Sequence, residues 1–152
     1  MELLKSQNMV IDSDNYMLGE LIAEEKGKVR SQRVLDVERG EPTMETSFSA
    51  TGKYRGVETT STVTYCATPK PGGAIYGEGQ GLLMSEDGQE MVTWTGQGIG
   101  RFTAPGKIRF TGSLFFNTSS TGKLAFLNNM VGVFEYEADE LGNTSAKSWE
   151  WK

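Results

Sequence analysis

Hydrophobic and polar residues alternate along most of the chain, in runs that are separated by turn signals. The runs are rich in Val, Thr, Tyr, Phe and Trp, which suit a pleated strand. Clusters of Gly, Pro and Asn, such as those within residues 69–73 and 104–106, mark the turns. Residues 123–128 carry a brief helical pattern. The pattern therefore predicts a meander with strands at 18–25, 28–38, 43–51, 54–68, 74–85, 89–103, 107–118, 129–139 and 143–152.

Several of these strands are long, and tight turns join them. An open sheet of this kind would leave exposed edges, which closure into a barrel removes. The expected fold class is therefore all-β, a closed antiparallel meander β-barrel of about eight strands. A two-sheet β-sandwich is the alternative. With 152 residues we expect one domain over 1–152, in which 1–17 is an irregular N-terminal segment.

The stretch GEGQGLLMSEDGQEMVTWTGQGIGR, residues 77–101, has glycine at alternate positions on both sides of a turn signal. A dinucleotide-binding loop needs G-x-G-x-x-G followed by a helix, but the third glycine is replaced by Leu82 in one run and Arg101 in the other. The STGK stretch at 120–123 lacks the remaining residues of a P-loop. Nucleotide binding through these motifs is disfavoured.

The same stretch fits a hairpin with its turn at 87–88. This register pairs Gly79 with Gly96 and Gly81 with Trp94. Because alternate side chains of a strand share a face, the glycines of both arms fall on the face that holds Trp94.

A three-residue loop at 104–106 gives the next hairpin. It places Thr103 opposite Lys107 and Gly98 opposite Gly112. One face then gathers seven glycines and the following apolar side chains: Ile75, Leu83, Val92, Trp94, Phe102, Ile108, Phe110, Leu114 and Phe116.

Glycine inside a strand loses packing and backbone entropy, so this cluster needs a compensating role. Sharply coiled strands can need room for bulky neighbours, the missing side chains can leave a cavity for an apolar or aromatic ligand, or another subunit can approach closely. Under the cavity hypothesis the ligand-binding residues are Trp94, Phe102, Phe110, Leu114, Phe116, Gly79, Gly96 and Gly98.

The residue inventory restricts the chemistry. The sequence has no His and a single Cys, Cys66, so it lacks Ser-His-Asp and Cys-His schemes and His-based metal sites. We expect no metal and no cofactor, and we expect Cys66 to be a buried, inert thiol. Strand Glu residues mostly face water, but a desolvated one could act as an acid or base. The candidates are Glu58, Glu78, Glu135 and Glu137.

The net charge of −5 is spread over scattered Lys, Arg, Asp and Glu, which gives no basic patch for nucleic acid and no polybasic membrane anchor. No apolar run approaches the roughly 20 residues of a membrane span, and the first residues do not match a signal peptide. We therefore expect a cytoplasmic protein that binds neither nucleic acid nor membranes.

Several motifs between residues 45 and 152 occur in a familiar order: GEGQGLL, EDGQE, WTGQGIGR, GSLFFNTSS, LAFLN and KSWEWK. With them the chain resembles a family of small, mostly bacterial proteins whose fold is grouped with allene oxide cyclase-like barrels. The resemblance implies an eight-stranded meander, frequent oligomers and a central apolar cavity. It carries no catalytic residue onto this sequence.

Two functions follow as expectations. The first is binding of a small hydrophobic or amphipathic molecule in the barrel, with simple binding or isomerase/cyclase-like chemistry. The second is a structural or interaction module with a fully packed barrel that forms a homo-oligomer.

Overall fold

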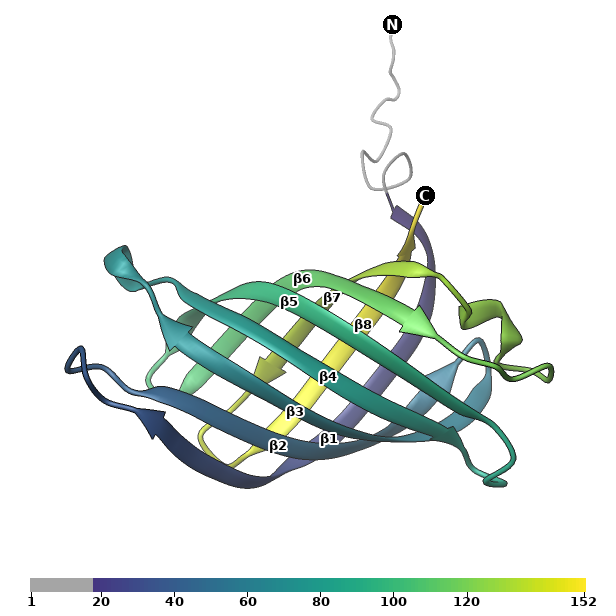
Figure 1. The fold of residues 1–152 in the computed structure, drawn as a ribbon, viewed down its shortest axis with the longest axis horizontal. Helices are drawn as coiled ribbons and strands as arrows, with labels where there is room; N and C mark the ends of the chain where they lie inside the picture. Colours follow the sequence, from purple (N-terminus) through teal and green to yellow (C-terminus); the bar gives the residue numbers. More distant parts are fainter. Residues whose placement is uncertain (1–17) are drawn as a thin grey trace, which may run out of the picture.

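The computed structural model describes residues 18–152, which form a closed barrel of eight antiparallel strands (Figure 1). Each strand pairs with its neighbours in sequence, and β1 pairs with β8 to close the barrel. The predicted barrel is confirmed, and the predicted irregular segment 1–17 lies outside the described residues. The strands are β1 (Leu18–Asp36), β2 (Thr43–Tyr54), β3 (Val57–Pro69), β4 (Ile75–Ser85), β5 (Met91–Ala104), β6 (Lys107–Asn117), β7 (Val131–Ala138) and β8 (Asn143–Trp151).

Two short 3-10 helices lie in the connections, η1 (Pro71–Gly73) and η2 (Ala125–Leu127). The second falls within the brief helical pattern at 123–128. Figure 1 places η2 at the same end of the barrel as the β4–β5 hairpin, while η1 lies at the opposite end.

The turn expected between 25 and 28 is wrong, because β1 is one strand of 19 residues. Its backbone stays paired there, with Lys26 opposite Thr51 and Gly27 opposite Ala50. A Cβ at Gly27 would overlap the Ser49 carbonyl oxygen of β2. This glycine therefore permits close approach of two strand backbones and does not mark a turn.

The expected pairing of Thr103 with Lys107 is also wrong. Lys107 pairs with Ala104, and the register shifts by one residue between Phe102 and Ala104. The turn is shorter than expected, with Gly106 at a φ of +76°, a conformation that suits glycine. Beyond this bulge the expected register of β5 and β6 is confirmed.

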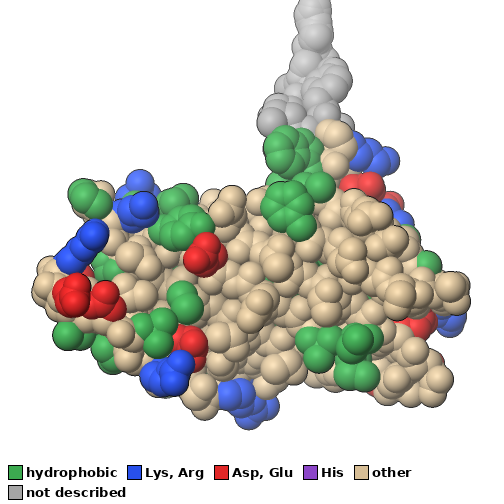
Figure 2. Space-filling model, in the orientation of Figure 1, with side chains coloured by type: hydrophobic (Ala, Val, Ile, Leu, Met, Phe, Trp, Pro, Cys, Tyr) green, Lys and Arg blue, Asp and Glu red, His purple; other side chains and the backbone are tan. Residues whose placement is uncertain are grey.

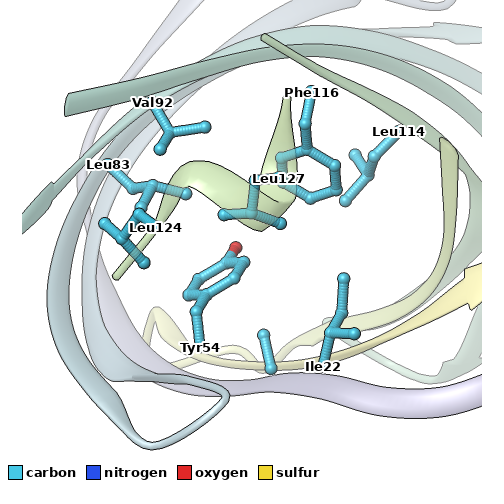
Figure 3. Close-up of a cluster of buried hydrophobic side chains, with 9 residues drawn as sticks. Ile22, Tyr54, Leu83, Val92, Leu114, Phe116, Leu124 and Leu127 are labelled. Carbon is cyan, nitrogen blue, oxygen red and sulfur yellow. The ribbon is translucent and has the colours of Figure 1, made fainter. Parts of the chain in front are cut away.

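The interior contains two clusters of buried side chains, one toward each end of the barrel. The first closes the end near η2, where Leu124 and Leu127 turn inward toward Tyr54 and Leu83 (Figure 3). All four side chains are almost completely inaccessible to solvent. The η2 segment therefore acts as a plug, and we use this name below for residues 124–127.

The second cluster lies nearer the opposite end and is aromatic in character. Its buried members are Phe48, Ala50, Val63, Ile75, Phe110 and Tyr136. Trp94 and Phe134 pack against both clusters, so they span the middle of the barrel.

Candidate functional site

The glycine face has the register that the sequence predicts, with Gly79 opposite Gly96 and Gly81 opposite Trp94. Aromatic rings occupy much of the space that the glycines leave. A Cβ at Gly81 would overlap the Trp94 indole, and a Cβ at Gly77 would lie 2.8 Å from Cε1 of Phe110. Gly77, Gly81 and Gly100 therefore make room for bulky rings, which is the first of the three explanations. At Gly98 and Gly112 a Cβ would instead overlap the backbone of the neighbouring strand.

Some space nevertheless remains between the two clusters, as a cavity of about 90 Å³. A cavity of about 150 Å³ lined by aliphatic and aromatic residues binds benzene, so this one has room for a molecule of roughly four non-hydrogen atoms. Aromatic side chains dominate its wall. They are Phe48, Tyr54, Tyr65, Trp94, Phe110, Phe134 and Tyr136.

Four of these rings form a layer across the barrel, which we call the aromatic layer: Phe48, Tyr65, Phe110 and Tyr136. Phe48 stacks on Tyr136 with centroids 5.1 Å apart, and Tyr65 meets Phe110 edge-on at 5.7 Å. The Tyr65 and Tyr136 hydroxyls share a hydrogen bond of 3.2 Å. Burial raises the pKa of both phenols, so both stay neutral at physiological pH.

Beyond the aromatic layer the barrel opens into a pocket of about 560 Å³, here called the mouth. Tyr65 and Phe110 line both the mouth and the cavity, so the aromatic layer separates the two. The mouth carries three carboxylates and one ammonium group, those of Glu41, Asp139, Glu140 and Lys70. Its local charge is therefore negative.

The carboxyl group of Glu25 in β1 lines the cavity from the inside of the barrel. Ser61 Oγ donates a hydrogen bond of 2.5 Å to Glu25 Oε2, and the Tyr54 hydroxyl donates one of 3.2 Å to Oε1. Glu25 is half-buried, and the surface it keeps faces the cavity. Protein atoms therefore surround its carboxyl group. Burial raises the pKa of Glu25, while the two hydrogen bonds oppose that shift.

No Lys or Arg of residues 18–152 lines the cavity beside Glu25. The other titratable groups on the wall are three tyrosines and Glu78. Burial also raises the pKa of Tyr54. Glu78 is exposed and accepts a hydrogen bond from the outward-facing Tyr76 hydroxyl, so it borders the cavity without pointing into it. Glu25 is thus the one acidic side chain that the described wall turns inward.

The sequence did not indicate Glu25, because Glu24 and Glu25 are adjacent and either could face inward. An extra residue at Ile22 also shifts the register, since Leu21 pairs with Trp149 while Ala23 pairs with Ser148. Carrying the alternation backward from Val29 would have placed Gly27, Glu25 and Ala23 on one face. The expected turn hid that signal.

Six of the eight expected ligand-binding residues line the cavity, and two do not. Phe102 lies in the mouth, two residues before the end of β5, and is 64% exposed. Phe116 packs beside the plug in the first cluster. The six that line the cavity are Trp94, Phe110, Leu114, Gly79, Gly96 and Gly98.

The four carboxylates expected as acid–base candidates all lie on exposed positions. Glu135 and Glu137 form ion pairs with Arg109, at 3.1 and 3.9 Å. Cys66 is half-buried, where a buried thiol was expected. Among residues 18–152 no group of three or more His, Cys, Asp or Glu side chains could hold a metal ion.

The STGK stretch does bind an anion, which is the chain's own Glu90. The Lys123 and Leu124 backbone N–H groups donate to the Glu90 carboxylate at 3.2 and 2.8 Å, and the Ser120 hydroxyl donates to it as well. A Cβ at Gly122 would lie 2.7 Å from the carboxyl carbon. These hydrogen bonds lower the pKa of Glu90 and tie the loop before the plug to the residue that precedes β5.

Two solved structures share the fold of this chain at low sequence identity. A crystal structure of a conserved protein of unknown function from Rhodopseudomonas palustris matches with a TM-score of 0.69 and 13% identity, over 88% of this chain and 97% of that one. A protein of unknown function from Clostridium acetobutylicum matches with a TM-score of 0.72 and 12% identity, over 88% and 98%. The sequence matches no family model and no curated protein. The chain therefore shares its barrel with proteins whose descriptions name no activity.

None of the helices among the described residues has the length and apolar character that crossing a membrane requires.

Proposed function

We propose that this barrel binds a small molecule in its central cavity. The observation that carries the proposal is a space of about 90 Å³ between the two buried clusters, with aromatic walls and, among the described residues, one inward carboxyl group. Apolar enclosure with a few placed polar groups is the usual composition of a ligand site. The cavity volume favours a compact molecule over the long lipidic ligands that an open barrel could hold.

The similarity to the Rhodopseudomonas and Clostridium proteins supports the barrel fold. Our proposal also includes that the barrel groups with allene oxide cyclase-like barrels and that the protein is cytoplasmic. Isomerase-like chemistry would need an acid or base in the cavity, and Glu25 is the group placed to act as one.

A titration series tests the proposal. The probes are 2-propanol, acetamide, acetate and isopropylammonium, each of four non-hydrogen atoms. The readout is the NMR shift of the Trp94 indole N–H. A ceiling of about 1.5 kcal/mol per non-hydrogen atom limits the dissociation constant to tens of micromolar at best, so millimolar concentrations are appropriate. At least one probe should give a saturable shift.

A matched pair of variants locates the binding. Ala146 lines the cavity, whereas Ala138 on the neighbouring strand lines the mouth. Ala146→Val should abolish the saturable shift, and Ala138→Val should preserve it. If no probe saturates, or if both variants bind as the wild type does, the cavity is not a binding site.

A second function, a homo-oligomeric interaction module, is favoured by the outer surface of the barrel. A groove of about 800 Å³ runs over β3–β6 and contains no charged side chain among its described residues. Phe115 is exposed in it. Figure 2 shows that the middle of the face over the front strands is largely uncharged, with charged side chains toward its ends and along its lower edge. We propose a second copy of the chain as its partner.

A further inference from the structure

The carboxyl group of Glu25 raises the question of which ligand would suit it. An ionised carboxylate inside a protein is strongly disfavoured unless a cation pairs with it. Ser61 and Tyr54 supply two neutral hydrogen-bond donors, and the described wall supplies no cation. Without an occupant, burial shifts the balance of this carboxyl group toward its neutral form. With a cationic occupant, the carboxylate gains the partner that the wall lacks.

The remainder of the wall also suits a cation. The face of an aromatic ring attracts a positive charge, and the attraction strengthens when water is excluded. Trp is the best such ring, and Trp94 lines the cavity together with Tyr65 and Tyr136. Alkyl groups on the cation would meet Leu114 and Ala50, which offer apolar contact.

The charge of the mouth, which leads toward the cavity, also favours a cation. Among residues 18–152, the charged residues that line the mouth are Glu41, Asp139 and Glu140 against Lys70. Hydrogen bonds from Asn143 and Leu141 lower the pKa of Asp139, so it is ionised at neutral pH. A cleft lined mainly by one sign of charge concentrates ions of the opposite sign. The mouth therefore favours the approach of cations toward the aromatic layer.

From these features we infer that the ligand of the cavity is a small organic cation, a protonated alkylamine or methylated ammonium of roughly four non-hydrogen atoms, with Glu25 as its counter-ion. This inference rests on the proposed function, because it names the ligand class of the same cavity. Binding makes and breaks no covalent bond, and a protonated Glu25 releases its proton to solvent as the cation enters.

The release of a proton links affinity to pH. The affinity for the cation should increase as the pH rises through the pKa of Glu25 and then level off. The groups that face Glu25 from β2 and β3 are Tyr54 and Ser61, which stay neutral over that range. Tyr65 and Tyr136 also remain neutral, so the pH dependence reports Glu25.

The test compares isopropylammonium with 2-propanol and acetate, which are similar in size and differ in charge. Binding is followed by the Trp94 indole N–H shift in the wild type, in Glu25→Gln and in Glu24→Gln. Glu24 is exposed on the same strand, so its variant removes the same charge outside the barrel. We expect isopropylammonium to bind at least tenfold more tightly than 2-propanol, with the preference lost in Glu25→Gln and kept in Glu24→Gln.

The outcomes separate the two proposals. Saturable binding of 2-propanol or acetate that equals or exceeds that of isopropylammonium overturns the cationic ligand and leaves the cavity as a binding site. A cation preference that persists in Glu25→Gln also overturns it. Saturation by none of the probes overturns the proposed function itself. Thermal unfolding of each variant confirms that the barrel is intact before titration.

Discussion

Glu25 couples the stability of the barrel to pH, and the direction follows from its environment. Burial raises the pKa of the folded carboxyl above its ordinary value of 4.5. Between the unfolded and folded pKa values the native state holds more protons than the unfolded state. The free energy of unfolding therefore falls as the pH rises through this window.

Glu25→Gln should remove that dependence, because glutamine stays neutral. The variant is expected to gain stability relative to the wild type as the pH rises from 4.5 through the folded pKa. Urea denaturation at a series of pH values measures this difference. A wild-type stability that rises with pH in step with the variant would contradict the assignment, and Glu24→Gln serves as the control.

Thr59 is the second residue whose chemistry differs from its surroundings. Its hydroxyl oxygen is buried and has no hydrogen-bond partner, and only 3% of the residue is exposed. An unsatisfied buried polar group costs about 1–3 kcal/mol. Thr59→Val, which keeps the shape and removes the hydroxyl, should raise the free energy of unfolding by about 1 kcal/mol.

Denaturant titration of Thr59→Val and of a Thr62→Val control separates this effect from β-propensity. Thr62 lies on the outer face of the same strand, in the groove. Equal gains in both variants would mean that the buried hydroxyl carries no penalty.

At the residue scale, the sequence predicted which side chains face the interior where apolar residues and glycine mark one face of a strand throughout. Six of the expected site residues line the cavity because the period of two fixes which side of β4, β5 and β6 each residue takes. The sequence prediction missed Glu25, because the turn expected between 25 and 28 interrupted the alternation that runs back from Val29 and the irregularity at Ile22 shifts the register just before it. It misplaced Phe102 because the end of a barrel strand is not visible in alternation alone.

At the scale of the elements, the carboxylate of Glu90 holds the loop before the plug through hydrogen bonds. Glu90, the residue before β5, accepts hydrogen bonds from the loop that leads into residues 124–127. These bonds lower its folded pKa, so the stabilisation exists above the unfolded pKa and is lost as the pH falls through the folded pKa.

Glu90→Gln should therefore loosen the plug at neutral pH with little effect on distant strands. Hydrogen exchange of the Leu124 amide is expected to accelerate, while that of the Val63 amide in β3 stays unchanged. The wild type should approach the exchange rate of the variant in acid. Unaltered protection at Leu124 would show that the leucines hold the plug without Glu90.

Elements were predicted well where turns contain glycine with positive φ and less well where strands coil. Gly88 and Gly106 sit at φ of +76° in hairpin turns, and both hairpins were expected. Gly27 lies inside a strand, although in the sequence it resembles a turn glycine. The difference between a turn glycine and a close-approach glycine arises from the neighbouring strand, which a local pattern does not contain.

For the whole molecule, the uncharged outer groove predicts self-association. Phe115 and Ile99 are exposed apolar residues on the outward side of β6 and β5. Phe115→Ser combined with Ile99→Ser should lower the molar mass measured by light scattering toward that of one chain. A wild-type protein that is monomeric at high concentration would contradict the oligomeric module.

The pairing of β1 with β8 has a further consequence, for chain connectivity. Leu18 lies opposite Trp151, so the start of β1 and the end of β8 lie side by side. A short linker could join these two ends, and new chain termini could be placed at the 87–88 turn, which contributes no residue to the aromatic layer. Such a circular permutant keeps every strand neighbour of the barrel, because a closed meander defines a cyclic order and not a starting strand.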